Sequence, residues 1–196
     1  MSDRQTTIVR RTTETEIELS LTLDGTGIGS IDTGVGFLDH MLSQFAVHGL
    51  FDLSVRAVGD RQVDDHHTVE DVGLALGEAV AAAVGDGTGI GRYGAATIPM
   101  DESLALVVVD LSGRSGCWID APLSGTIGGF DAELIEEFLI GVSRGGRLTL
   151  HARILAGTNR HHMAEALFKA LGRSMDRATM LDPRRVGVPS SKGSLG

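Results

Sequence analysis

Two short stretches of the chain repeat one pattern of histidines and a glutamate that could bind metal ions. Each has two adjacent histidines and, three residues later, a glutamate: His66, His67 and Glu70 in one, and His161, His162 and Glu165 in the other. On a helix, residues four apart share a face, so the first histidine and the glutamate of each copy would meet at one point. The second histidine projects about 100 degrees away around the helix and could serve another centre. The two copies therefore predict two metal sites.

Two further histidines, His40 and His151, belong to segments that flank the expected metal helices. With them the chain offers six imidazoles and two carboxylates, enough for two centres of three imidazoles and one carboxylate each. This ligand set without thiolates favours Mn, Fe, Co, Ni or Zn over Ca²⁺ and Mg²⁺. Four protein ligands on a metal that prefers six leave positions open for substrate, so we expect a catalytic pair of manganese ions. The seventh histidine, His48, is expected to cap a helix instead.

The duplication extends beyond the motifs to the strand and turn that precede each helix. At the 95-residue offset that superposes the motifs, these residues align: 53–55 with 148–150, Asp64 with Asn159, His40 with Ile135, and His151 with Arg56. Two apolar strands, at 16–23 and 104–111, align at an offset of 88, which sets Glu14 over Glu102. A few residues have thus been inserted or lost between the two registers. The third histidine of each expected metal centre, His40 or His151, has no histidine at the equivalent position of the other half.

The spacing of apolar residues predicts strands, helix, strand and helix in each half. The expected elements after the two aligned strands are 37–47, 53–58 and 66–84 in the first half, and 132–143, 147–155 and 160–178 in the second. Asp64 or Asp65 and Asn159 are expected to cap the two metal helices. We therefore predict a single α+β domain over residues 1–196, built from two fused, internally duplicated half-domains of about 1–86 and 87–196. Each half would be a sheet with helices packed on one face.

Composition narrows the class of protein. At 196 residues the chain can bury a sizeable core without disulfides, and its one cysteine, Cys117, cannot form an internal bridge. With a net charge of −9 it is not expected to bind nucleic acid, and no apolar run is long enough to cross a membrane. The N-terminus lacks an apolar signal core, so we expect a cytoplasmic protein. Its 15 arginines outnumber two lysines, and arginine suits a small phosphorylated ligand.

The glycine-rich segment 85–91 invites interpretation as a nucleotide-binding loop, which we reject. No expected strand leads directly into it, and no Gly-Lys-Ser/Thr follows it. We interpret it as the flexible link between the two halves.

With these residues assembled, the chain resembles the imidazoleglycerol-phosphate dehydratase family of histidine biosynthesis over nearly its full length. The segments that carry the resemblance are Arg10-x-Thr12-x-Glu14-Thr15, 37–42, 65–71, 159–165 and 189–193. The resemblance implies a lyase that dehydrates D-erythro-imidazole glycerol phosphate to imidazole acetol phosphate. It implies two Mn²⁺ ions that hold the substrate's imidazolate ring, replaceable by other divalent transition metals, and no organic cofactor.

The family resemblance also assigns roles to single residues. It makes these eight the metal ligands: His40, His66, His67, Glu70, His151, His161, His162 and Glu165. By helix geometry we group His66 with Glu70 on one metal and His161 with Glu165 on the other. Glu14 matches the family's acid/base carboxylate. The positions that match substrate-binding residues are Glu14, Gln44, Arg92, Arg114, Ser190, Ser191 and Lys192, with Arg92, Arg114, Ser190 and Lys192 mainly on the phosphate.

The same resemblance implies a homo-oligomer, a 24-subunit shell built from trimers with metal sites at subunit contacts. Some members carry a fused phosphatase that uses Asp-x-Asp-Gly-Thr. Here Asp24-Gly25-Thr26 follows Thr22-Leu23, so the nucleophilic aspartate is missing and we expect the single-function form.

Two other functions stay open on the residues alone. A dinuclear metallohydrolase would also use paired histidine and carboxylate sites, although it usually needs carboxylate bridges and this set is richer in imidazole. A metal-binding scaffold without catalysis would make Glu14, Arg92, Arg114 and Lys192 incidental. Turnover of imidazole glycerol phosphate separates all three.

Overall fold

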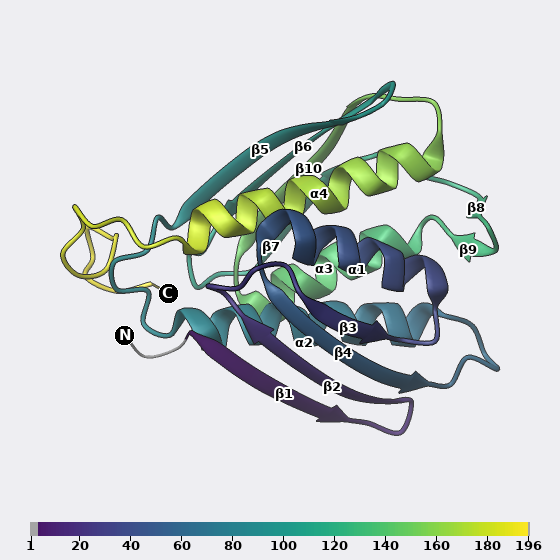
Figure 1. Ribbon diagram of the computed structural model, residues 1–196, viewed down its shortest axis with the longest axis horizontal. Coiled ribbons are helices and arrows are strands. Elements are labelled where there is room, and N and C mark those ends of the chain that lie inside the picture. Colours follow the sequence, from purple (N-terminus) through teal and green to yellow (C-terminus); the bar gives the residue numbers. More distant parts are fainter. Residues whose placement is uncertain (1–3, 196) are drawn as a thin grey trace.

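A computed structural model describes residues 4–195, and in that range two four-stranded sheets enclose four helices (Figure 1). The elements are β1 (Gln5–Arg11), β2 (Thr15–Thr22), β3 (Gly29–Asp32), α1 (Gly36–Gly49), β4 (Asp52–Gly59), α2 (His66–Val84), β5 (Tyr93–Met100), β6 (Ser103–Asp110), β7 (Gly116–Asp120), β8 (Thr126–Ile127), β9 (Phe130–Asp131), α3 (Leu134–Gly146), β10 (Thr149–Ala156) and α4 (Arg160–Thr179). None of these helices is long and apolar enough to span a lipid bilayer.

The two sheets have the same topology, which confirms the duplicated α+β fold. Their strand orders are β1-β2-β4-β3 and β5-β6-β10-β7, and in both the last pair is parallel while the others are antiparallel. Strand β2 alternates buried and exposed residues, with Ile17, Leu19 and Leu21 facing the helices. This period of two gives each sheet one apolar face for the helices and one face toward solvent. The division of the chain at residues 86 and 87 stays a prediction.

The strand registers correct the alignment of the two halves. Leu21 pairs with Leu53 in the first sheet, and Val109 pairs with Leu150 in the second. Leu21 and Val109 are related by the offset of 88, so Leu53 corresponds to Leu150. The expected match of residues 53–55 with 148–150 is therefore wrong by two positions. The strands follow an offset of 97 and the helices one of 95, because the loop after β10 is shorter than the loop after β4.

The corrected register changes the counterpart of His151. On the neighbouring strand His151 lies opposite Trp118, as Ser54 lies opposite Ser30 in the first sheet. Its counterpart is therefore Ser54 and not Arg56.

The counterpart of His40 also changes. Helices α1 and α3 both end at a residue in the left-handed conformation, Leu50 (φ 58°) and Arg147 (φ 47°). Superposing these two ends sets His40 over Glu137 and not over Ile135. The cap at the C-terminal end of α1 is Leu50, whose backbone N–H donates to the carbonyl oxygen of Ala46, and not His48. The third histidines remain unduplicated, as expected.

The helices of the two halves interlock in the middle layer. Long helix α2 covers β1 and β2, and α4 covers β5 and β6, whereas α1 packs on α4 and α3 packs on α2. Glycines allow the close crossings: a Cβ at Gly77 would lie 2.3 Å from the carbonyl oxygen of Val142, and one at Gly172 would lie 2.5 Å from that of Phe45. Each half thus completes its core with a helix of the other half.

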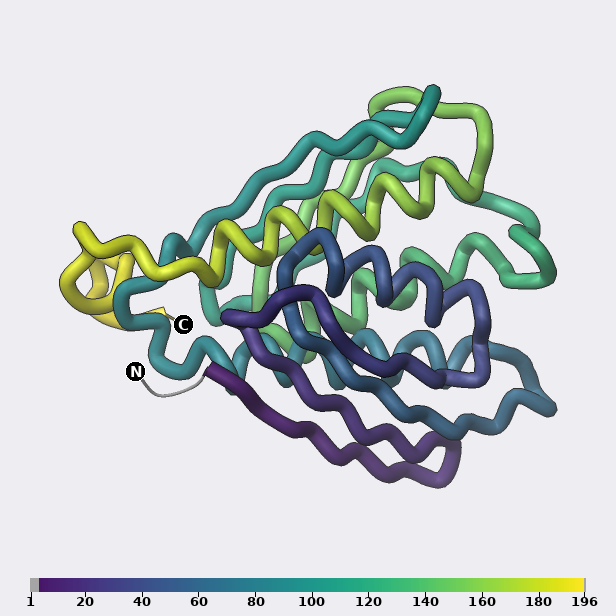
Figure 2. Tube along the Cα trace, viewed as in Figure 1, coloured from purple at the N-terminus to yellow at the C-terminus, as the bar shows by residue number. Residues whose placement is uncertain are grey.

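Several strands escape prediction from the sequence. Strands β1, β3, β5 and β7 mix polar and apolar residues or are only four or five residues long, so no clear alternation marks them. They pair at the sheet edges, where hydrogen bonding to a central strand stabilises segments of weak intrinsic preference. The starts of α2 and α4 lie at one end of the molecule, and the tail after α4 lies at the other (Figure 2).

Candidate metal and substrate site

The start of α4 forms a compact cluster with α1. The side chain of Asn159 caps α4 by accepting hydrogen bonds from the backbone N–H groups of His161 (2.9 Å) and His162 (3.4 Å). Across the helix pair, Nε2 of His40 lies 3.2 Å from Oε2 of Glu165, and Nε2 of His161 lies 3.3 Å from the same oxygen. The ligand atoms of His40, His161 and Glu165 lie within 4.8 Å of one another, close enough to share one cation.

Glu165 is buried, and its charge is balanced from the side away from the histidines. Burial opposes its ionisation, but hydrogen bonds from Lys169 and His40 outweigh that effect and lower its pKa. Nζ of Lys169 lies 2.6 Å from Oε1, which leaves Oε2 for the two imidazoles. Lys169 was missed in the sequence, although its spacing of four from Glu165 on a helix is a signal for such a pair.

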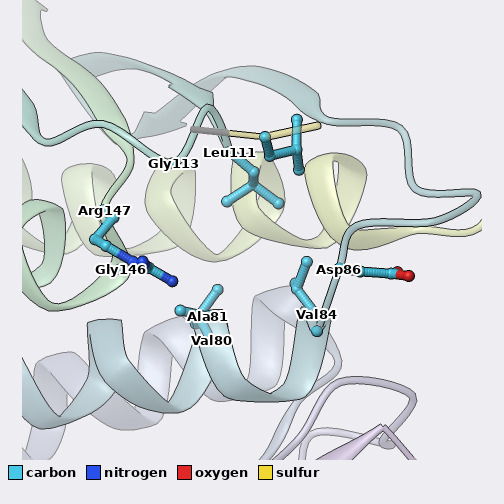
Figure 3. A pocket seen from close by; sticks show the side chains of 10 residues that line it. Val80, Ala81, Val84, Asp86, Leu111, Gly113, Gly146 and Arg147 are labelled. Atoms are coloured by element: carbon cyan, nitrogen blue, oxygen red, sulfur yellow. The ribbon is translucent and has the colours of Figure 1, made fainter. Parts of the chain in front are cut away.

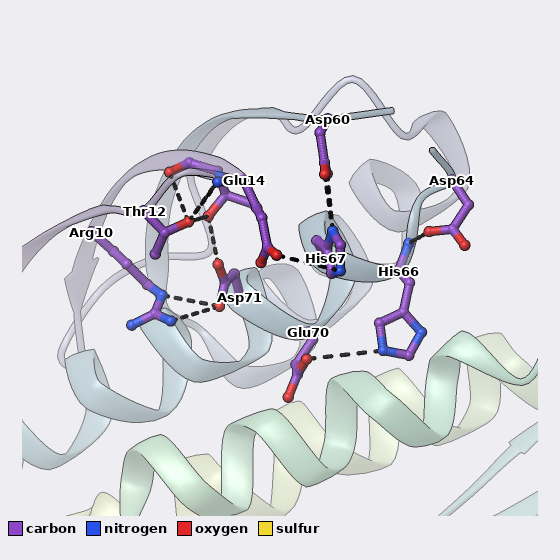
Figure 4. A network of polar contacts seen from close by, with 10 residues as sticks. Arg10, Thr12, Glu14, Asp60, Asp64, His66, His67, Glu70 and Asp71 are labelled. Atoms are coloured by element: carbon purple, nitrogen blue, oxygen red, sulfur yellow. Dashed lines mark hydrogen bonds and ion pairs between the residues drawn. The ribbon is translucent and has the colours of Figure 1, made fainter. Parts of the chain in front are cut away.

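The start of α2 repeats this arrangement more loosely (Figure 4). Asp64 accepts a hydrogen bond from the backbone N–H of His66 (2.8 Å), so it caps the helix although Asp65 is the residue that precedes it. Nε2 of His66 lies 3.9 Å from Oε2 of Glu70, and Arg144 of α3 holds the other oxygen at 3.3 Å. The expected pair of His66 and Glu70 thus faces one point, but no third histidine of the described chain joins it.

The second histidine of each motif turns to a different set of carboxylates. His67 contacts Asp60, and His162 contacts Glu102. In both cases the hydrogen bond with the carboxylate outweighs desolvation and raises the pKa of the imidazole. The hydrogen bond with His162, helped by the backbone N–H of Asn159, in turn lowers the pKa of Glu102. No pattern in the sequence points to Asp60, and the only signal for Glu102 is its alignment with Glu14.

Glu14 lies on the turn between β1 and β2, beside α2 (Figure 4). The hydroxyl of Thr12 accepts hydrogen bonds from the backbone N–H groups of Glu14 (3.1 Å) and Thr15 (2.9 Å), which shapes this turn. The Glu14 side chain is half exposed, and its Oε1 lies 3.8 Å from Nε2 of His67. An expected acid/base carboxylate and an expected metal ligand are therefore neighbours.

His151 does not join the other expected ligands within the chain. It lies on β10 between the buried residues Leu150 and Ala152, so it points to the outer face of the sheet, away from the helices. There it stacks on Trp118, with ring centroids 4.8 Å apart and planes at 11°.

The expected phosphate-binding residues lie at the far end of α4 from the histidines. The backbone N–H of Arg92 donates to Ala178 near the end of α4, whereas His161 lies at its start, about 25 Å away at 1.5 Å per residue. The Arg92 guanidinium binds Asp110 (2.8 and 3.2 Å) and the carbonyl oxygen of Pro189 (2.9 Å). The tail with Ser190, Ser191 and Lys192 is thus tethered at this end, and Arg114 follows β6 there. Gln44 lies in the middle of α1, half-buried.

A small cavity of about 90 Å³ also lies at this end, between the end of α2 and the tail (Figure 3). Leu111, Val84 and Leu195 provide much of its lining, and Arg147 contributes at the edge. None of the expected metal ligands or phosphate-binding residues lines it, so it is separate from the candidate site.

Comparisons with known proteins agree on one family. The family model described as imidazoleglycerol-phosphate dehydratase matches residues 33–175. Relatives of that name include the protein of Desulforamulus reducens, 51% identical over 196 residues and 100% of both chains. The Bacillus subtilis protein is 53% identical over 188 residues, which cover 95% of this chain and 97% of the relative.

Solved structures of the same name share the fold. The crystal structure of imidazoleglycerol-phosphate dehydratase from Staphylococcus aureus has a TM-score of 0.82 and 40% identity, covering 91% of this chain and 99% of that one. The structure of IGPD from Pyrococcus furiosus in complex with (S)-C348 has a TM-score of 0.83 and 37% identity, covering 96% and 100%.

Proposed function

Because the chain belongs to the imidazoleglycerol-phosphate dehydratase family, we propose that it dehydrates D-erythro-imidazole glycerol phosphate to imidazole acetol phosphate in histidine biosynthesis. The observation that most directly supports this activity is the convergence of His40, His161 and Glu165 from helices far apart in the sequence. The reaction removes a proton from one carbon of the glycerol chain and a hydroxyl from its neighbour. A cytoplasmic location suits the lone cysteine, Cys117.

The donor set fits two transition-metal ions, and we assign them manganese. His40, His161 and Glu165 would hold one ion, and His66 and Glu70 would begin the second site. Imidazole nitrogen with one carboxylate oxygen per site suits Mn²⁺ better than Ca²⁺ or Mg²⁺. When bound, the two cations would stabilise the negative charge of the substrate's imidazolate ring.

Completion of each active site requires a second copy of the chain. His151 faces outward, and Arg92 lies about 25 Å from His161, a separation set by the length of α4. Arg92 is thus too far to contact a small substrate held by the histidine cluster of its own chain, and His151 points away from the helices that carry this cluster. We therefore propose a homo-oligomer, a 24-subunit shell built from trimers, in which His151 and the tail of one copy serve the site of another.

Glu14 is proposed to move the proton at the reacting carbon. Its carboxylate is half exposed beside His67, within reach of a molecule bound at that edge of the cluster. A carboxylate with access to solvent can exchange its proton between turnovers. Gln44, Arg92, Arg114, Ser190, Ser191 and Lys192 are proposed to hold the substrate, with planar arginine forks suited to its phosphate.

A turnover assay tests this function. The Mn²⁺-loaded protein is mixed with imidazole glycerol phosphate, and the enolised ketone product is followed by absorbance. We expect product with the wild type and a loss of at least about 100-fold in kcat with Glu14→Gln, the lower end of the range for acid/base residues. Release of inorganic phosphate in place of the ketone would indicate a metallohydrolase. Manganese binding without either product would indicate a scaffold.

A further inference from the structure

Two carboxylates outside the expected ligand set, Asp60 and Glu102, contact the Nδ1 atoms of His67 and His162. Nδ1 of His67 lies 3.1 Å from both oxygens of Asp60, and Nδ1 of His162 lies 2.7 Å from Oε2 of Glu102. We propose that Asp60 and Glu102 are positioning residues that present Nε2 of His67 and His162 to a metal ion. This inference rests on the proposed function, since it assumes that these histidines bind metal.

The geometry leaves one nitrogen of each ring available. Nε2 of His67 lies 3.8 Å from Glu14, and Nε2 of His162 lies 3.8 Å from Asp101, both too far for a hydrogen bond. A carboxylate at Nδ1 fixes the tautomer with hydrogen on Nδ1 and a lone pair on Nε2. Histidines that bind metals commonly donate their other N–H to a carboxylate in this way.

Glu102 is held too firmly to act as a mobile proton carrier. Its Oε1 accepts hydrogen bonds from the backbone N–H groups of Thr158 (3.2 Å) and Asn159 (2.8 Å) and from the hydroxyl of Ser103 (3.1 Å). Since Asn159 caps α4, one carboxylate joins the β5–β6 hairpin, the start of α4 and the His162 ring. Its contacts therefore define where His162 points.

The duplication explains why Glu14 and Glu102 differ. Both immediately precede the second strand of their sheet, Thr15–Thr22 and Ser103–Asp110. In the first half, Asp60 from the longer loop after β4 contacts Nδ1 of His67, and the Glu14 carboxylate lies 3.8 Å from Nε2 of the same ring, beyond hydrogen-bond distance. In the second half, the loop 157–159 contains no acidic residue, and Glu102 takes the ring of His162. The same position thus became a proton-transfer group in one half and a positioning group in the other.

Manganese binding without substrate tests this assignment. Wild type, Glu102→Gln and Asp60→Asn are titrated with Mn²⁺, and free Mn²⁺ is measured by electron paramagnetic resonance. In Glu102→Gln the amide oxygen can still accept from the two backbone N–H groups, which turns the NH₂ toward Nδ1 and favours the wrong tautomer. We expect each variant to weaken one of two sites by about 10- to 100-fold, and the double variant to weaken both.

Asp101→Asn is the matched control, because Asp101 is exposed on the same hairpin and asparagine tolerates its left-handed backbone (φ 48°). We expect wild-type manganese affinity for this variant. Equal affinity in Glu102→Gln and Asp101→Asn would overturn the proposal. So would equal weakening of both sites with a lower unfolding midpoint of the metal-free protein, which would indicate a general structural role. The titration contains no substrate and does not depend on turnover. A wild type that binds two Mn²⁺ but makes no product would therefore reject the proposed function, while the manganese affinities of the variants would still decide whether Asp60 and Glu102 position metal ligands.

Discussion

Asp71 shows how a single buried residue can hold the expected acid/base turn in place. Its carboxylate accepts a hydrogen bond from the Thr15 hydroxyl (2.5 Å) and pairs with Arg10 (2.9 Å), so the end of β1 and the start of β2 are tied to α2 (Figure 4). All of these groups lie in the sequence segments that resemble the family, yet none is an expected ligand. Their role is to fix the turn that carries Glu14.

We expect Asp71→Asn to lower the free energy of unfolding by about 2 kcal/mol, because it leaves Arg10 without its charged partner in a largely buried setting. Urea denaturation of the metal-free protein measures this. Glu16→Gln is the matched control, since it breaks the exposed pair of Glu16 with Arg11 on the same hairpin and should cost under about 0.5 kcal/mol. Equal losses in the two variants would contradict the buried role of Asp71.

Cys117 is expected to react slowly with thiol reagents. Burial, with a smaller contribution from the charge of Glu136, raises its pKa to about 11. Because the thiolate is the reactive form, the folded protein at pH 8 should react with a disulfide reagent about 100-fold more slowly than free cysteine. The same reaction in concentrated urea should proceed at the rate of an exposed thiol. A fast reaction in the folded state would show that the thiol is more accessible than its partly buried position in the structure indicates.

At the scale of elements, the close crossing of α2 and α3 depends on glycine. A Cβ at Gly77 would also lie 2.4 Å from the backbone nitrogen of Gly146, so α3 would have to move. We expect Gly77→Ala to destabilise the protein by about 2 kcal/mol, although alanine favours a helix by about 1 kcal/mol in isolation. Gly36→Ala, at an exposed position with no neighbouring atom within 4 Å, should be neutral or slightly stabilising. Thermal denaturation of the two variants compares them directly.

The tail after α4 is the element expected to bind the phosphate. Ending the chain before Pro189 should raise KM by about 10-fold or more with little change in kcat, because charge-assisted hydrogen bonds to the phosphate contribute to binding and not to the chemical step. Ending it after Gly193 keeps Ser190, Ser191 and Lys192 and is the control. Steady-state kinetics that give both shortened chains the wild-type KM would refute the role of the tail.

At the scale of the whole molecule, the separation of the expected site residues makes assembly testable. If His151 of one copy completes the metal site of another, removal of metal should weaken the oligomer. We expect sedimentation velocity in EDTA to show smaller species, and added Mn²⁺ to restore the large one. Mg²⁺ should not restore it, because it prefers oxygen ligands. An unchanged sedimentation coefficient after complete metal removal would show that assembly does not depend on these ions.

The sequence by itself predicted what depends on local spacing. The helix starts with their histidines follow from a period of 3.6 residues and from Asn159 as a cap, and the duplication follows from comparing two stretches of one chain. These features need no knowledge of the partner element. The edge strands β1, β3, β5 and β7 were not predicted, because their pairing and not their composition stabilises them.

Only the tertiary structure decided which elements meet. It brought His40 of α1 to His161 and Glu165 of α4, set His151 on the outer face, and paired Asp60 with His67 but Glu102 with His162. The two-residue error in the strand alignment had hidden the true counterparts of His40 and His151. The physical reason is that helix crossings and sheet registers depend on packing between distant segments, where glycine contacts and loop lengths select one arrangement that local spacing leaves open.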